Sequence, residues 1–442
     1  MCTFFLAIWL GILLIYNIYI KKTPIIHPTI LFCFTFWLNA VFYLVWIPKF
    51  PDIRINTALL VLLFCLLFSI SAGVKIELKT TDKWKKNTCD STRENRGFIH
   101  YICVSNYKTN IFLIFSIISF VAYYFAIRNI VLSAGVGLSS YSSIMAAYSA
   151  ISKFTTKNVD IPVYVKLMKE LVYAAGFVLG FIQINNFFVN GKKAVKPVIA
   201  FNIVISGLIS LIIGSRSELV KLILAMVIMS FAYTIAYSTH KNQKKLTFKI
   251  VILFFLILIS FKTLGNLLGR INTRTLLETL FMYIGGPLKN LDIAINEKIL
   301  YSELPGQLTF AYQYRNLANL LRNNNLMYNT SLPFTVLNDT DLGNVYTAFA
   351  VYLADFGILF SVSLIVIMGF ICGFLYRRFF ISIINNSKPM WILVYSFLAY
   401  SILMEGFSEK FYGILFSANL YRHFIWFYLL IRFFMKNYKE RL

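Results

Sequence analysis

The sequence holds 442 residues, of which 59% are hydrophobic and only 14% are charged. An ordinary soluble domain carries about 25% charged residues, so this composition excludes a water-soluble globular protein. The net charge of +24 would suit nucleic acid or an anionic lipid surface. However, the Lys and Arg residues gather in short loops between apolar runs, which disfavours nucleic acid and indicates a membrane topology.

Eleven apolar runs of membrane-spanning length follow one another along the chain. They are continuous rather than alternating, which predicts helices because the backbone must satisfy its own hydrogen bonds in hydrocarbon. The first run is too long for a signal peptide and has no small-residue cleavage site, so we expect it to be retained. The predicted spans are 3–20, 29–47, 57–74, 110–132, 163–188, 197–214, 217–238, 249–268, 356–376, 389–405 and 412–434.

The basic connections give these spans an orientation. Every strongly basic loop follows an odd-numbered span, and the largest is a basic cytoplasmic loop at 75–109. Because Lys and Arg stay on the cytoplasmic side, the amino terminus is predicted to face outward and the carboxyl terminus inward. The near-neutral segment 269–355 then becomes one large outer loop. We predict an all-α polytopic chain in which residues 1–442 form one integral membrane domain.

The outer loop 269–355 is too long to lack structure. Short interfacial helices are predicted at Thr273–Tyr283 and Leu308–Arg322. The loop is rich in Asn and Tyr, which can hydrogen-bond hydroxyls and stack on sugar rings. A simple polar loop explains the same composition. The candidate sugar-binding residues are Tyr283, Tyr314, Asn319 and Tyr346.

Arg216 is the most informative cation, because positive charge at the outer membrane boundary has no topological purpose. It lies in a hairpin of a few residues between two spans, close to Glu218 in the sequence. An arginine at bilayer depth is a functional candidate that can bind phosphate oxygens through two hydrogen bonds. A snorkelling anchor, or a structural ion pair with Glu218, is the alternative.

Further arginines belong to the large outer loop. Arg270 and Arg274 are one helical turn apart just after span eight, so their guanidinium groups can share one anion. Arg315 and Arg322 form a second pair on the predicted helix Leu308–Arg322. A solvated helix face is the alternative for either pair. It is favoured for Arg322 and disfavoured for Arg270, which lies close to the membrane. The candidates for pyrophosphate binding are therefore Arg216, Arg270, Arg274 and Arg315.

Two carboxylates near the outer face are candidates for a general base on a sugar hydroxyl. Asp355 precedes span nine, where a helix cap is the structural alternative, and Glu405 ends span ten. Metal-ligand spacing, a Gly-rich phosphate loop and a nucleotide-binding domain are all lacking, and the six cysteines imply no disulfide framework. We therefore expect no metal and no cofactor, with the reaction energy stored in the substrate.

Three short motifs lie at or near the predicted outer face. They are Gly214-Ser215-Arg216, Tyr283-Ile284-Gly285-Gly286-Pro287, and Asn344-Val345-Tyr346-Thr347-Ala348-Phe349 leading into Tyr352 and Asp355-Phe356-Gly357. These motifs resemble those of the Wzy-type O-antigen polymerases, which join oligosaccharide repeat units in bacteria. In layout, the resemblance covers about residues 110–430.

The resemblance implies a GT-C-like helical glycosyltransferase at the periplasmic face of the bacterial inner membrane, acting in lipopolysaccharide biosynthesis. Its substrates would be undecaprenyl-pyrophosphate-linked oligosaccharides, and each transfer would release undecaprenyl pyrophosphate. Arg216 and Arg270 would hold the donor pyrophosphate, Arg274 and Arg315 that of the acceptor, and Asp355 or Glu405 would assist the acceptor hydroxyl. Membrane lipids, a chain-length regulator and a flippase are the implied partners.

Alternative functions stay open. A lipid-linked oligosaccharide flippase would place charges along a central pathway, often with repeated halves and short loops, whereas here the charges crowd one face. The O-antigen ligase family relies on a loop histidine, and the outer loop has none. A membrane O-acetyltransferase is disfavoured for the same reason. Polymerisation is therefore the function that we expect.

Overall fold

The computed structural model describes residues 1–47, 50–74, 100–135, 141–154, 161–213, 216–237, 275–323, 332–338 and 340–435. The chain divides into two compact units, each described here by itself. Unit 1 comprises Met1–Leu78, Arg274–Arg377 and Leu398–Leu420; unit 2 comprises Lys79–Thr273, Arg378–Phe397 and Tyr421–Leu442. Both units combine separated stretches of the sequence. The single domain over 1–442 and the basic loop at 75–109 stay predictions.

The described chain is mostly helical, and six of its helices are long and apolar enough to cross a membrane. They cover Cys2–Ile20, Ile55–Gly73, Asn106–Ser133, Val163–Ala194, Ser217–Tyr237 and Ala348–Ile384. This confirms the all-α, membrane-embedded fold class. The count of eleven spans and the GT-C-like architecture stay predictions, and the predicted span 249–268 lies outside the described residues.

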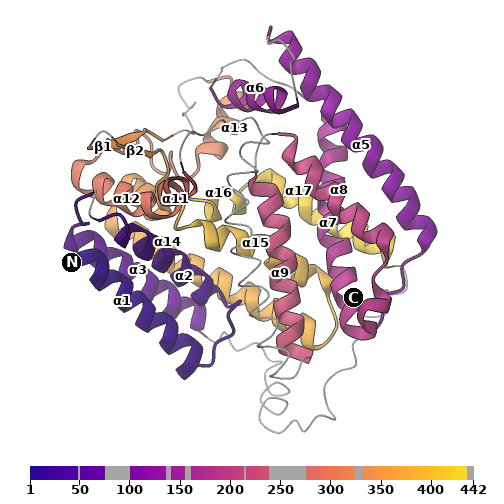
Figure 1. The fold of residues 1–442 in the computed structure, drawn as a ribbon, viewed down its shortest axis with the longest axis horizontal. Helices are drawn as coiled ribbons and strands as arrows, with labels where there is room; N and C mark the ends of the chain where they lie inside the picture. Colours follow the sequence, from indigo (N-terminus) through magenta and orange to yellow (C-terminus); the bar gives the residue numbers. More distant parts are fainter. Residues whose placement is uncertain are drawn as a thin grey trace. The chain divides into compact units, whose positions relative to one another are not determined.

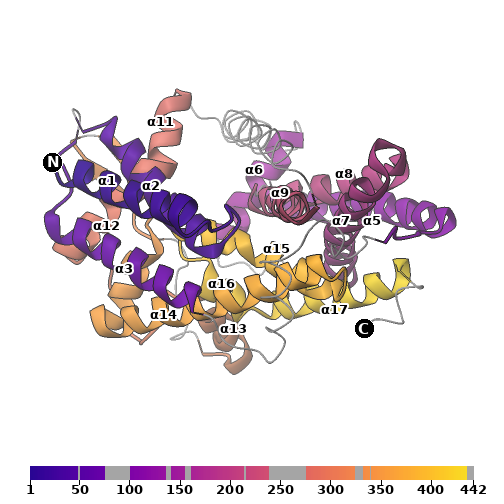
Figure 2. The ribbon, with the colours of Figure 1, turned by 90° about the horizontal axis from the view of Figure 1, so that it is seen from below.

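Unit 1 begins with three helices that pack on one another and lie side by side in Figures 1 and 2. They are α1 (Cys2–Ile15), which continues as the π-helical turn η1 (Tyr16–Ile20), α2 (Pro28–Leu44) and α3 (Ile55–Gly73). Its later elements are α11 (Leu276–Leu280), η4 (Phe281–Gly285), α12 (Gly286–Glu297), α13 (Ala311–Leu321), β1 (Thr335–Leu337), β2 (Thr340–Gly343) and α16 (Phe411–Leu415). Strands β1 and β2 form an antiparallel hairpin.

Unit 2 is built around one long buried helix, α7 (Val163–Asn190), which packs against α5, α8 and α9. These neighbours are α5 (Asn106–Ser133), α8 (Pro197–Leu211) and α9 (Ser217–Tyr237), and the unit also holds α6 (Tyr141–Phe154), η3 (Gly191–Ala194) and α17 (Ala418–Phe434), the last from Tyr421 onward. Helices α14 (Ala348–Ile384) and α15 (Pro389–Met404) contribute residues to both units.

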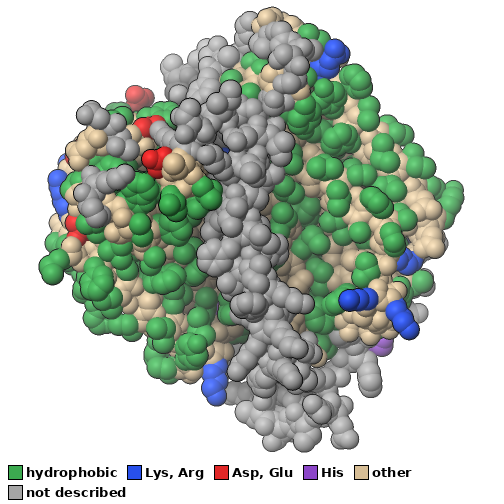
Figure 3. Space-filling view, in the orientation of Figure 1, with side chains coloured by type: hydrophobic (Ala, Val, Ile, Leu, Met, Phe, Trp, Pro, Cys, Tyr) green, Lys and Arg blue, Asp and Glu red, His purple; other side chains and the backbone are tan. Residues whose placement is uncertain are grey.

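Hydrophobic side chains cover much of the visible surface of the helices (Figure 3). On α1, Phe4 is 59% exposed, and on α5, Ile114 is 59% exposed. A soluble protein rarely exposes large continuous apolar patches, whereas a lipid-facing helix does so along its length. The surface therefore agrees with the membrane-embedded class that the sequence predicts.

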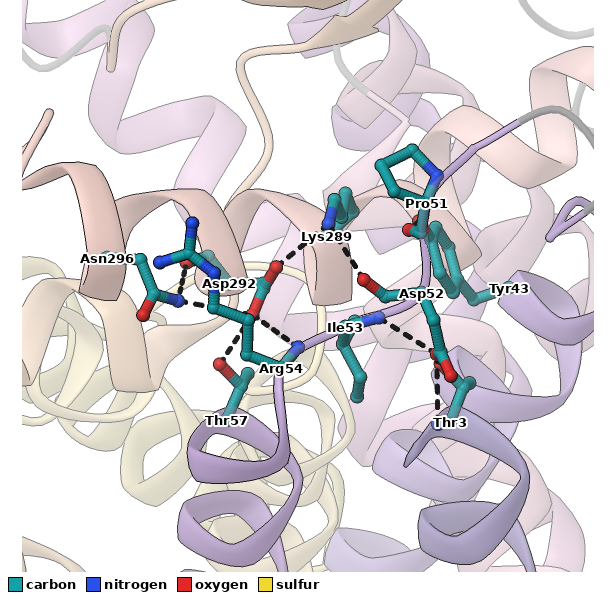
Figure 4. Close-up of polar contacts among 10 residues, drawn as sticks. All are labelled: Thr3, Tyr43, Pro51, Asp52, Ile53, Arg54, Thr57, Lys289, Asp292 and Asn296. Carbon is teal, nitrogen blue, oxygen red and sulfur yellow. Dashed lines mark hydrogen bonds and ion pairs between the residues drawn. The ribbon is translucent and has the colours of Figure 1, made fainter. Parts of the chain in front are cut away.

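A polar network holds the segment after α2 against α12 within unit 1 (Figure 4). Asp292 of α12 pairs with Lys289 at 2.8 Å, and both side chains are buried. The Oδ1 atom of Asp292 accepts hydrogen bonds from the backbone N–H of Arg54 at 2.9 Å and from the hydroxyl of Thr57 at 2.7 Å. Because the buried charges are paired and hydrogen-bonded, the network can persist in an apolar setting. It fixes the start of α3 to the loop helices.

Close backbone contact joins α3 and α14 in unit 1. Gly369 and Gly373 are four residues apart on α14, and both face the end of α3. A Cβ atom built on Gly369 would lie 2.9 Å from the carbonyl oxygen of Phe68, and one on Gly373 would lie 3.0 Å from the carbonyl carbon of Ala72. Small residues at this spacing let membrane helices approach closely.

Replacing Gly373 by valine should destabilise the protein by about 2 kcal/mol, because the added side chain must push two packed helices apart. The measurement is the apparent melting temperature of the detergent-purified protein. Gly73→Ala is the matched control, because a Cβ atom at Gly73 meets nothing within 4 Å. Equal melting temperatures for Gly373→Val and the wild type would contradict the close contact.

Candidate functional site

Two groups of polar side chains lie at helix ends that the charge pattern predicts to be outer. The carboxylate group belongs to unit 1 and consists of Asp355, Glu405 and Glu409. The basic group belongs to unit 2 and consists of Lys169, Arg216, Lys221 and Arg422. The chemical capacity of each group follows from how its members are held.

Asp355 is fully engaged by the chain segment just before α13. Its Oδ1 atom accepts the backbone N–H of Leu308 at 3.1 Å, and its Oδ2 atom accepts both the N–H and the hydroxyl of Thr309 at 2.6 Å. The side chain of Asp355 therefore caps no helix start, because the donors to its carboxylate are Leu308 and Thr309 of the loop. Two residues after Asp355, helix α14 is interrupted at Gly357, whose φ is +65°. Asp355 fixes the loop to this interruption.

Glu405 follows the last residue of α15 and is completely buried. Its Oε2 atom accepts the hydroxyl of Tyr352 at 2.8 Å, and its Oε1 atom accepts the backbone N–H groups of Lys410 at 3.2 Å and Phe411 at 2.9 Å. Its own carbonyl oxygen accepts the N–H of Ala348 at 2.8 Å. Glu405 thus ties the start of α14 to the turn after α15.

Glu409 is held differently from the other two carboxylates. Its Oε1 atom accepts the backbone N–H groups of Tyr412 at 2.7 Å and Gly413 at 3.0 Å. Its Oε2 atom accepts no hydrogen bond from any described residue, and the residue is half-buried. Burial raises the pKa of Glu409, and the charge of Asp355 raises it further, whereas the two backbone hydrogen bonds and Lys410 oppose the rise.

Ion pairs organise the basic group in unit 2. Lys169 of α7 pairs with Glu218 of α9, and the side chains are only 10% and 19% exposed. The next residue of α7, Glu170, accepts two hydrogen bonds at 2.9 Å from the guanidinium of Arg422 in α17. Glu218, which is the partner of Arg216 in the structural alternative, thus forms an ion pair with Lys169. Lys169 and Glu170, which are adjacent on α7, thus link this helix to α9 and to α17.

Arg216 and Lys221 lie on the same end of α9. Arg216 immediately precedes α9, is half-buried, and its carbonyl oxygen accepts the N–H of Val220 at 3.0 Å. The ammonium group of Lys221 lies 4.4 Å from the centre of the Phe397 ring. Among the described residues, the group combines four basic side chains with two carboxylates, Glu170 and Glu218. The region therefore carries more positive than negative charge, which favours an anionic ligand.

The remaining predicted site residues fall into different settings. Arg315 and Tyr314 lie on α13, where Arg315 is exposed and the hydroxyl of Tyr314 donates to the carbonyl of Pro305 at 2.9 Å. Tyr283 is half-buried and stacks on Phe407 with 5.7 Å between ring centres. Tyr346 is fully buried and donates to the carbonyl of Pro333 at 3.0 Å.

Three predicted site residues have no described side chain. Arg270 and Arg274 lie outside the described residues, and Asn319 is described only as part of the α13 backbone. The structure therefore brings together Asp355 and Glu405 in unit 1 and places Arg216 in unit 2. It leaves the two loop arginines as predictions.

Sequence reasoning missed Glu409, Lys169, Lys221 and Arg422. A signal for Glu409 existed, because it lies in the short segment between spans ten and eleven that was predicted to be outer. Lys169 and Arg422 lie inside predicted spans, where a charge is costly and marks a functional or paired residue. No group of three or more His, Cys, Asp or Glu residues in the described ranges is arranged to hold a metal ion.

Compared with protein-family models, with curated proteins and with solved structures, the chain matches none of them.

Proposed function

We propose that the protein is an O-antigen polymerase of the bacterial inner membrane. It joins undecaprenyl-pyrophosphate-linked oligosaccharide repeat units at the periplasmic face and releases undecaprenyl pyrophosphate. The observation that carries the proposal is the basic group, in which Lys169 pairs with Glu218 and Arg422 pairs with Glu170, while Arg216 and Lys221 belong to the same end of α9.

The ligand suits this charge pattern. A lipid pyrophosphate carries its negative charge at the membrane boundary, at the depth where the basic group is predicted to lie. Arginine binds phosphate oxygens through two parallel hydrogen bonds, and lysine adds a compact point charge. The developing charge on a departing pyrophosphate is stabilised by such fixed cations. In this proposal Arg216 contacts the pyrophosphate, with Lys221 adding positive charge.

The ion pairs of the basic group act as its scaffold. Lys169 with Glu218 joins α7 to α9, and Glu170 with Arg422 joins α7 to α17. Charged pairs between helices hold their ends in register at the start of a span, where the surroundings change from water to hydrocarbon. A purely structural role for these two pairs is compatible with binding by Arg216, because a fixed framework preorganises the ligand site.

The test uses the full-length protein in proteoliposomes loaded with a radiolabelled, polyprenyl-pyrophosphate-linked repeat unit. Neither nucleotide nor divalent metal is added, and EDTA is present. A ladder of products that differ by one repeat unit supports the proposal. Movement of intact lipid-linked units across the bilayer, with no ladder, would contradict it and favour a flippase instead.

A further inference from the structure

The turn after α15 contains one carboxylate whose hydrogen bonding is incomplete. Asp355 receives three hydrogen bonds and Glu405 receives three, with both oxygens of each engaged. Glu409 receives two, both on Oε1. An oxygen that already accepts hydrogen bonds is a poorer proton acceptor. Among the three carboxylates, Glu409 thus has the available oxygen.

A second acceptor without a donor lies near Gly413, the glycine whose N–H donates to Glu409. The amide nitrogen of Gln313 on α13 donates to the carbonyl oxygen of Gly413 at 3.2 Å. This bond fixes the amide orientation, so that its oxygen is the buried atom with no hydrogen-bond partner among the described residues. A buried acceptor without a donor is energetically unfavourable. A ligand that donates a hydrogen bond would remove this cost.

The absence of a side chain at Gly413 lets the Oε2 atom of Glu409 lie close to its backbone. A Cβ atom built at this position would lie only 2.9 Å from Oε2 of Glu409. Aromatic rings border the same segment: Phe416 is 52% exposed and stacks on Tyr412 with 6.3 Å between ring centres. Two acceptors that lack donors, beside an exposed ring, match a sugar, which offers several hydroxyl donors and an apolar ring face.

We infer that Glu409 and Gln313 bind the acceptor sugar, and that Oε2 of Glu409 removes the proton from its reacting hydroxyl. This inference rests on the proposed polymerase function and deepens it by naming the base. A second hydroxyl of the same sugar donates to the amide oxygen of Gln313. Asp355 and Glu405 then act as positioning residues that hold α13 and the turn in place.

The transfer moves one proton, forms one glycosidic bond and breaks one bond to pyrophosphate. The hydroxyl proton moves to Glu409 while the hydroxyl oxygen forms a bond to the anomeric carbon of the donor sugar. The bond between that carbon and the pyrophosphate oxygen breaks, and its electron pair leaves with the polyprenyl pyrophosphate. The proton then passes from Glu409 to water, which restores the carboxylate for the next transfer.

The alternative role for Glu409 is purely structural, because Oε1 caps the first turn of α16. Glutamine in its place keeps an oxygen that can accept the same two N–H groups, so Glu409→Gln preserves the cap and removes the base. General base catalysis contributes about 10²–10⁴-fold to a rate. We therefore expect kcat for polymerisation to fall at least about 100-fold in this variant, with a much smaller change in KM.

The pH profile separates catalysis from structure. Glu409 accepts a proton only when ionised, so kcat should fall as the pH drops through its raised pKa, above the ordinary carboxyl value of about 4.3. The charged groups around it are Asp355 from α14, Glu405 from the end of α15 and the adjacent Lys410. The acidic limb should persist in Glu409→Asp with lowered kcat, and vanish in Glu409→Gln.

The decisive experiment measures kcat and KM against pH for the full-length protein in proteoliposomes with the lipid-linked repeat unit. Gln313→Leu should raise KM for the acceptor, and Glu297→Gln, an exposed carboxylate of the same unit, is the matched control. If Glu409→Gln keeps the acidic limb of the wild-type pH profile, the inference about Glu409 is overturned. Product ladders formed by the wild-type protein would still support polymerisation in that case. If Glu409→Gln fails to insert into the membrane, Glu409→Asp is measured in its place. A kcat of Glu409→Asp equal to that of the wild type would overturn the assignment of Glu409 as the base. Absence of ladders from the wild type overturns both proposals.

Discussion

Replacing Arg216 by alanine should give a membrane-inserted protein that builds no long oligosaccharide chains. Removal of one preorganised donor to a developing negative charge typically lowers kcat about 10²–10³-fold. The loss should fall on kcat more than on KM, because the charge on the leaving pyrophosphate grows in the transition state. The measurement is the product ladder formed by equal amounts of purified wild-type and variant protein.

Two further variants make the Arg216 result specific. Arg216→Lys keeps the charge but loses the paired hydrogen bonds, so we expect intermediate activity. Arg54→Ala removes an exposed arginine from a segment that is also predicted to be outer, and should behave like the wild type. Normal ladders from Arg216→Ala would remove this residue from the proposed site.

Replacing Lys169 by methionine should destabilise the protein more than any other single change in the basic group. Its partner, Glu218, is 19% exposed in its side chain and would keep a charge without its closest partner. Removing one member of a buried pair costs about 3 kcal/mol or more, because the remaining charge is left uncompensated. We expect a clearly lower apparent melting temperature in detergent and reduced amounts of inserted protein.

The double variant Lys169→Met, Glu218→Gln tests this reason directly. Because both charges are then absent, most of the lost stability should return, as it often does when a buried pair is replaced as a whole. Equal destabilisation in the single and double variants would show that the loss comes from packing rather than charge. The backbone contact from the Tyr173 hydroxyl to the carbonyl of residue 218, at 2.8 Å, is kept in both variants.

The membrane helices could be predicted because their signal is local. A run of apolar residues of sufficient length must become a helix in hydrocarbon, and the prediction 163–188 differs little from α7 (Val163–Asn190). The break in the last predicted span, 412–434, was missed. There the chain forms α16 and α17, and the hydroxyl of Ser417 between them accepts the N–H of Leu420 at 3.2 Å.

The loop elements were predicted less well because distant residues decide where they begin. The predicted helix Leu308–Arg322 starts only at Ala311 in the structure. The N–H groups of Leu308 and Thr309 are directed to the carboxylate of Asp355, which is more than 45 positions away. Periodicity within the loop carries no information about that contact. The β1–β2 hairpin was missed for a similar reason, because its strands are very short.

The candidate site was predicted in its residue types more than in its roles. The distribution of charges along the predicted spans selected Arg216 and the carboxylates Asp355 and Glu405. These residues lie among buried or half-buried polar contacts. Burial and hydrogen-bond saturation cannot be read from spacing, so the sequence offered no means of separating the saturated Asp355 and Glu405 from Glu409. Pairing between Lys169 and Glu218 was hidden for the same reason, because 49 positions separate them.

The most direct test of the polymerase proposal is the stoichiometry of the reaction. The purified protein is incubated with a lipid-linked repeat unit in EDTA, and mass spectrometry counts new glycosidic bonds and released polyprenyl pyrophosphate. The account predicts one polyprenyl pyrophosphate for every bond formed, without nucleotide. Release of polyprenyl pyrophosphate without bond formation, or no release at all, would contradict it.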